Sequence, residues 1–100
     1  MSDATTGKVL LVDDEAGLRE AVQAYLEDSG FDVQVASNAA EGWEKLQLAT
    51  PDVIISDIMM PQVDGYQFLE QVRQDPRYKA LPFIFLTARG MTSDRIQGYS

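Results

Sequence analysis

The sequence has 100 residues, of which 45% are hydrophobic and 24% charged, so we expect at most one domain of ordinary globular composition. It contains no cysteine and no histidine, which excludes disulfides and the usual zinc or copper sites and leaves oxygen ligands for any metal. The formal net charge of −8 argues against direct nucleic-acid binding, because such binding needs a basic face.

The first part of the chain predicts a strand and then a helix. Residues 1–7 are small and polar, and we expect them to form a disordered leader before a domain over residues 8–100. The apolar run 8–12 predicts a strand. A helix is predicted from Glu15, and Ser29-Gly30 is expected to end it. Its apolar residues recur at helical spacing: Leu18, Ala21, Val22, Tyr25 and Leu26.

A second strand and helix follow. Residues 31–35 alternate between apolar and polar, which is typical of a strand with one buried face and indicates a sheet edge. Asn38 followed by Glu41 resembles a capping box and predicts a helix start, and Thr50-Pro51 is expected to end that helix.

The next segment predicts a buried strand that delivers a carboxylate. Residues 53–56 form a short apolar run that is typical of a central parallel strand, and Asp57 follows directly. Asp64 and Gln67 then predict the capped start of a third helix, which Asp75-Pro76 is expected to end.

The last segments predict a further strand over 83–87 and a fourth helix over 91–100, which Gly98 weakens. The alternation of strands and helices predicts an α/β fold with a parallel sheet. Strand 83–87 has the composition of a central strand, so we expect at least one more strand and helix after Ser100, which would make the chain a fragment. The alternative is that helices or another chain cover this edge.

Three aspartates form the candidate site. Asp13 and Asp14 follow the first strand and Asp57 ends a second, so all three are expected at the carboxyl edge of the sheet, where α/β folds bind ligands. Crowded carboxylates repel one another unless a divalent cation lies among them, and Mg²⁺ is the natural candidate. Asp57 is the better nucleophile, because it stands alone on a central strand with a turn behind it. For Asp13 and Asp14 the alternative role is helix capping.

Two further signals accompany the aspartates. Thr87-Ala88 end strand 83–87 at the same edge, where a hydroxyl could bond a phosphate oxygen beside a small residue, although a local turn bond is the simpler role. Met60-Pro61 and Gly65 predict a turn after Asp57.

Together these motifs resemble the receiver domain of two-component response regulators, in order and spacing from residue 8 to residue 100. The resemblance implies a flavodoxin-like, doubly wound (βα)5 fold, of which this chain would hold about four βα units and lack the last strand and helix. It implies a phosphoacceptor domain that takes a phosphoryl group from a histidine kinase onto Asp57 with Mg²⁺ bound and changes conformation to control an output such as transcription.

The resemblance also assigns roles to residues. Asp57 would be the phosphoacceptor. Asp14 and Asp57 would bind Mg²⁺ directly, Asp13 through water and Met59 through its main-chain carbonyl, with Mn²⁺ as an alternative ion. Thr87 would be the switch residue that contacts the phosphoryl group, and Ala88 its small neighbour.

Partners and location follow from the same resemblance. It implies a histidine kinase or phosphotransfer protein as partner, a cytoplasmic location, no membrane contact and no nucleic-acid contact by this domain; a homodimer is left open. The domain would assist its own phosphorylation and dephosphorylation without being an enzyme with a separate substrate.

The family pattern is incomplete here. The lysine that the family carries after a fifth strand, and the aromatic switch residue on that strand, have no counterpart in the chain, and Lys79 is in the wrong place. One alternative is therefore a receiver-like interaction module that is not phosphorylated. A second alternative, a magnesium phosphatase or phosphotransferase, commonly wants a carboxylate two residues after the nucleophile, and that residue is Met59.

Overall fold

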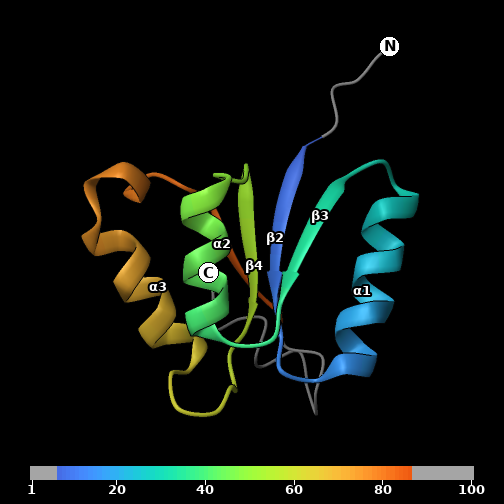
Figure 1. The fold of residues 1–100 in the computed structure, drawn as a ribbon, viewed down its shortest axis with the longest axis horizontal. Helices are drawn as coiled ribbons and strands as arrows, with labels where there is room; N and C mark the ends of the chain where they lie inside the picture. The colour runs from blue at the N-terminus through green and yellow to red at the C-terminus, as the bar shows by residue number, and fades with distance from the viewer. Residues whose placement is uncertain (1–6, 87–100) are drawn as a thin grey trace.

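The computed structural model describes residues 7–86, which form a parallel sheet with helices on both of its faces (Figure 1). The strands are β2 (Lys8–Val12), β3 (Asp32–Ala36), β4 (Val53–Asp57) and β5 (Phe83–Leu86). The helices are α1 (Ala16–Asp28), α2 (Ala39–Leu48), α3 (Gly65–Gln74) and the short 3-10 helix η1 (Pro76–Tyr78). Residues 1–6 of the predicted leader and the predicted helix 91–100 lie outside the described residues, whereas Gly7, which was predicted to end that leader, is placed and its carbonyl accepts the Asp32 N–H at 2.9 Å. No helix in the described range is long and apolar enough to cross a membrane.

The strands lie in the order β3-β2-β4-β5, and every pairing is parallel. The carboxyl ends of all four strands therefore meet at one edge, as predicted. Within the described sheet β3 is an edge strand, which confirms the prediction from its alternating sequence. β5 is the other edge of this sheet, and the predicted strand beyond it stays a prediction.

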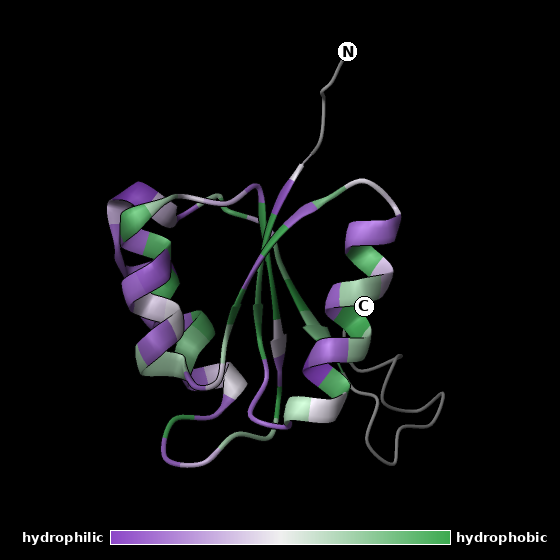
Figure 2. Cartoon of the chain, turned by 45° about the vertical axis from the view of Figure 1, so that its right-hand side comes forward, coloured by the Kyte–Doolittle hydropathy of each residue, from purple (hydrophilic) through white to green (hydrophobic). Residues whose placement is uncertain are grey.

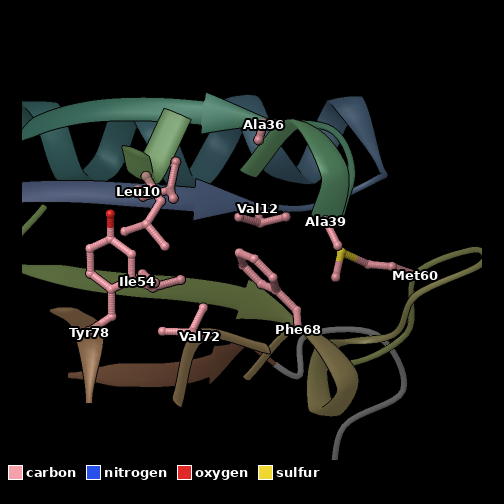
Figure 3. Packing of buried hydrophobic residues seen from close by; sticks show 10 residues of the cluster. Leu10, Val12, Ala36, Ala39, Ile54, Met60, Phe68, Val72 and Tyr78 are labelled. Atoms are coloured by element: carbon pink, nitrogen blue, oxygen red, sulfur yellow. The ribbon is translucent and has the colours of Figure 1, made fainter. Parts of the chain in front are cut away.

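The larger core lies between the sheet and helices α2 and α3. Figure 3 shows side chains of β2 and β4 pointing into the same layer as Phe68 and Val72 of α3. The buried members of this core are Leu10, Val12, Ala36, Ala39, Leu46, Ile54, Met60, Phe68, Val72 and Tyr78.

A smaller core lies between the sheet and α1. It consists of Val9, Leu11 and Val33, against which Val22 and Leu26 of α1 pack. Figure 2 shows the hydrophobic strands enclosed between α1 on one side and α2 and α3 on the other. Tyr25 shares the helical spacing of the apolar residues in α1 but is 71% exposed, so the apolar stripe that faces this core is narrower than the sequence pattern.

The helix ends agree with the predicted signals, with one difference. Gly30 has a φ of 102°, and its N–H closes the end of α1 on the Glu27 carbonyl at 3.0 Å. Asp64 and Gln67 form a complete capping box at the start of α3. At α2 the box is only half formed: Asn38 accepts the Glu41 N–H, but the Glu41 carboxylate accepts from Ser37 instead of Asn38.

The sequence did not predict η1. Asp75-Pro76 was expected only to end α3, yet the Asp75 side chain accepts the Arg77 N–H and starts a short turn of 3-10 helix. This turn buries Tyr78, whose ring meets Trp43 of α2 edge-to-face with centroids 5.9 Å apart.

Candidate functional site

The structure brings Asp13, Asp14 and Asp57 together at the carboxyl edge of the sheet. Val12 pairs with Ser56 in the register of β2 and β4, so the residues that follow them lie side by side. One carboxylate oxygen from each aspartate lies within 4.8 Å of those of the other two. Asp13 and Asp57 are buried and Asp14 is exposed. Residues 44 positions apart in the sequence thus form one acidic cluster that is open on the Asp14 side.

Asp13 is held by hydrogen bonds to three different parts of the chain. Its N–H donates to the Ala36 carbonyl at 3.0 Å, which extends the pairing of β2 and β3 past the end of β2. Its Oδ1 accepts the Glu15 N–H at 2.9 Å, and its main-chain carbonyl accepts from Nη1 of Arg19 at 2.8 Å. Glu15 occupies the N-cap position of α1, so neither Asp13 nor Asp14 is the N-cap residue of this helix, although Asp13 accepts the N–H of Glu15.

Asp57 is the last residue of β4 and is 4% exposed. Its Oδ1 accepts the Met59 N–H at 3.3 Å, and its main-chain carbonyl accepts from the Ser56 hydroxyl at 3.0 Å. The loop that follows β4 therefore orients Oδ1 of the Asp57 carboxylate through the Met59 N–H. The predicted role of the Met59 carbonyl as a metal ligand stays a prediction.

The two methionines after Asp57 have different environments. Met59 is 64% exposed at the site, whereas Met60 is buried and its side chain points toward Ala39 (Figure 3). Met60 therefore anchors the loop in the larger core, while Met59 presents its side chain to solvent beside the acidic cluster.

The predicted turn after Asp57 is present and unusually tight. The Val63 N–H donates to the Pro61 carbonyl at 2.8 Å, and Gln62 between them has a φ of 70°, as in a γ-turn. The Gly65 N–H donates to the Ile58 carbonyl at 2.8 Å. This bond draws the start of α3 against the end of β4, so the loop leaves and returns at nearly the same place.

Comparison with known proteins decides the family. A sequence model described as the response regulator receiver domain matches residues 9–100. The chain belongs to the response regulator receiver domain family. This confirms the resemblance found in the sequence, and the fold is that of a receiver domain.

Relatives and solved structures agree with this assignment. The chain is 66% identical over 92 residues to the response regulator Rre1 of Synechocystis sp., covering 91% of this chain and 40% of that protein. It is 46% identical to the probable transcriptional regulator ycf29 of Porphyra purpurea, covering 92% of this chain and 44% of that protein. The structure of the chemotaxis protein CheY4 of Vibrio cholerae superposes with a TM-score of 0.81 at 37% identity, covering 95% of this chain and 79% of that one. The receiver domain thus spans less than half the length of these two relatives.

The acidic cluster of this receiver domain suits a hard divalent cation. All three candidate donors are carboxylates, and Mg²⁺ prefers oxygen ligands. Two of the three are buried, where mutual repulsion between carboxylates is strongest and a cation would relieve it most. The chemistry of the cluster therefore fits Mg²⁺. Thr87 and Ala88 lie outside the described residues, so their predicted roles stay predictions.

Sequence reasoning missed a small polar pocket beside the acidic cluster. The pocket has a volume of about 140 Å³ and is lined by Arg19, Val35, Ala36, Ser37, Glu41 and Lys45. Lys45 donates to the Val35 carbonyl at 2.6 Å and lies 3.5 Å from the Glu41 carboxylate. Hydrogen bonds from the N–H and hydroxyl of Ser37 are the main cause that lowers the pKa of Glu41. In the sequence, Arg19 and Lys45 are recognisable only as cations on predicted helices. Because such cations usually face solvent, nothing local marked them as lining a pocket.

Proposed function

We propose that this chain takes a phosphoryl group onto Asp57 from a phosphorylated histidine kinase or phosphotransfer protein, with Mg²⁺ bound in the acidic cluster. The observation that carries the proposal is the convergence of Asp13, Asp14 and Asp57 at the carboxyl edge, in a chain of the receiver family. Asp57 is the proposed acceptor because it is buried at the end of a central strand and the Met59 N–H orients one of its oxygens.

The reaction would be a transfer between two side chains. A carboxylate oxygen of Asp57 attacks the phosphorus of the donor's phosphohistidine, an O–P bond forms, and the N–P bond breaks with its electron pair left on the histidine nitrogen. Asp14 and Asp57 would hold the ion directly, Asp13 through water and Met59 through its carbonyl. When bound, Mg²⁺ neutralises negative charge on the transferred group. The protein would take part in its own phosphorylation and dephosphorylation and have no separate substrate.

The consequence would be a shift between conformations. A phosphoryl group on Asp57 adds charge at the sheet edge and would favour the arrangement in which Thr87, with Ala88 leaving room, contacts it. We propose transcription as the output of the whole protein, because several relatives carry names of transcriptional regulators. A cytoplasmic location and a kinase partner belong to the same proposal.

Intact mass spectrometry of the chain tests the proposal. After incubation with Mg²⁺ and a small-molecule phosphodonor, we expect one phosphoryl adduct on the wild type, removed by hydroxylamine, and none on Asp57→Asn. Asp32→Asn is the control and should be labelled like the wild type, because Asp32 begins β3 and so lies at the amino ends of the strands, away from the acidic cluster. Equal labelling of Asp57→Asn would show another acceptor. An unlabelled wild type would instead favour an interaction module that is not phosphorylated.

A further inference from the structure

The turn that carries Asp13 and Asp14 is tied to helix α1 by one side chain. Arg19 lies in the second turn of α1 and is half-buried, and its Nη1 reaches back to the Asp13 carbonyl at 2.8 Å. The other main-chain polar group of Asp13, its N–H, donates to Ala36 at the end of β3. The peptide groups on both sides of Asp13 are therefore fixed, one by the sheet and one by Arg19.

We propose that Arg19 is a positioning residue of the acidic site. Its guanidinium would hold the Asp13 carbonyl and thereby keep Asp13 and Asp14 where they can share a cation with Asp57. This inference rests on the proposed Mg²⁺ site but assigns a role to a residue outside the acidic cluster.

The physical basis is the repulsion within the cluster. Three carboxylates whose oxygens lie within 4.8 Å push one another apart, and Asp14, the exposed member, is the one least enclosed by neighbouring atoms. A hydrogen bond from a charged donor to the Asp13 carbonyl opposes that movement, because such bonds are stronger than neutral ones. Groups that orient metal ligands from outside typically change metal affinity when they are removed.

The positive charge of Arg19 and its hydrogen bond to Asp13 are expected to have opposite effects on the affinity for Mg²⁺. A positive side chain beside a cation site weakens cation binding by repulsion, so its removal should strengthen Mg²⁺ binding if only charge matters. If Arg19 acts by position, its removal should weaken Mg²⁺ binding despite the loss of a positive charge. The sign of the change therefore separates the two roles.

Lys45 provides a matched control. It also extends from a helix, lines the same pocket, and donates to a main-chain carbonyl at a strand end, that of Val35. The variants Arg19→Met and Lys45→Met each remove one positive charge and keep an unbranched apolar side chain. Only Arg19→Met removes a bond to a residue of the acidic cluster.

The experiment is an NMR titration of the backbone amides of the chain with MgCl₂, for the wild type and both variants. We expect Arg19→Met to bind Mg²⁺ about tenfold more weakly, and Lys45→Met to bind at least as tightly as the wild type. Arg19→Lys, the milder change if Arg19→Met does not fold, should also bind more weakly, because one ammonium on a shorter reach replaces the guanidinium. Unchanged or tighter binding by the Arg19 variants, or equal weakening in Lys45→Met, would overturn the proposal.

Hydrogen exchange of the metal-free chain separates this inference from the proposed function. The Asp13 and Glu15 amides should exchange faster in Arg19→Met than in Lys45→Met, because their hydrogen bonds depend on the fixed position of Asp13. If the wild type does not bind Mg²⁺, the metal site fails, and this comparison still decides whether Arg19 positions Asp13. Equal exchange of these amides in the two variants would show that it does not.

Discussion

Gly65 lies so close to the main chain of Asp57 that a Cβ at position 65 would overlap the Asp57 carbonyl oxygen and lie 2.9 Å from the Cα of Ile58. Both of these groups are main chain, so neither can swing aside as a side chain would. The glycine is needed for this close approach, which fixes the distance between the end of β4 and the start of α3.

The first prediction concerns this contact. Gly65→Ala should lower the free energy of unfolding by about 1–3 kcal/mol, because the added methyl group forces the main chain apart, and it should slow labelling of Asp57. Gly17→Ala is the control, since nothing lies within 4 Å of a Cβ there. It should stabilise α1 by up to about 1 kcal/mol. Urea unfolding of both variants measures the difference, and equal stability of the two would contradict the geometry.

The second prediction concerns Asp14. Asp14→Ala should weaken Mg²⁺ binding by at least about tenfold. Without metal it should leave stability unchanged or raise it by up to about 1 kcal/mol, because repulsion in the cluster falls. Thermal melts with and without Mg²⁺ measure both effects. Asp28→Ala, an exposed carboxylate at the other end of α1, should not change Mg²⁺ binding. A large loss of stability in metal-free Asp14→Ala would instead support the capping role.

The third prediction concerns pH. Because hydrogen bonds from Ser37 lower the pKa of Glu41 in the folded chain, the carboxylate stabilises the fold above the pH at which an ordinary glutamate titrates, about 4.3. That contribution is lost as pH falls through the lowered pKa. Glu41→Gln should therefore cost about 1 kcal/mol or less at neutral pH and make the acid side of the stability curve shallower. Parallel urea titrations from neutral pH to acid test this, and identical curves for variant and wild type would contradict it.

The fourth prediction uses two leucines of one helix. Leu46 is fully buried in the larger core, and Leu48 is 84% exposed two residues later. Leu46→Ala should destabilise the chain by about 2–5 kcal/mol, and Leu48→Ala should change stability by less than about 0.5 kcal/mol. Similar losses in the two variants, measured by chemical unfolding, would mean that α2 presents a different face to the sheet.

The order and type of the described strands and α-helices could be predicted, because strand and helix periodicity is local in the sequence, whereas the 3-10 helix η1 was not predicted. The meeting of Asp13 with Asp57 could also be predicted, since parallel strands must bring their carboxyl ends to one edge. Boundaries differ by a residue: the strands predicted over 31–35 and 53–56 are observed as Asp32–Ala36 and Val53–Asp57.

Other features of the site depend on contacts between distant segments. Nothing local distinguishes Met59 from Met60, yet one is exposed and the other is buried against α2. Arg19 resembles any cation on a helix surface until the Asp13 carbonyl is placed beside it. Gly65 was predicted as a turn residue, but its close approach to Asp57 depends on the path of the whole loop.

The position of β2 has a consequence for the order of folding during synthesis. Among the described strands β2 is made first but lies between β3 and β4, so one of its sides has no partner in the described sheet until residue 53 and those after it have emerged from the ribosome. Until then the nascent chain carries Asp13 and Asp14 but not Asp57. A cation that binds all three carboxylates can therefore stabilise the sheet only after β4 has been made.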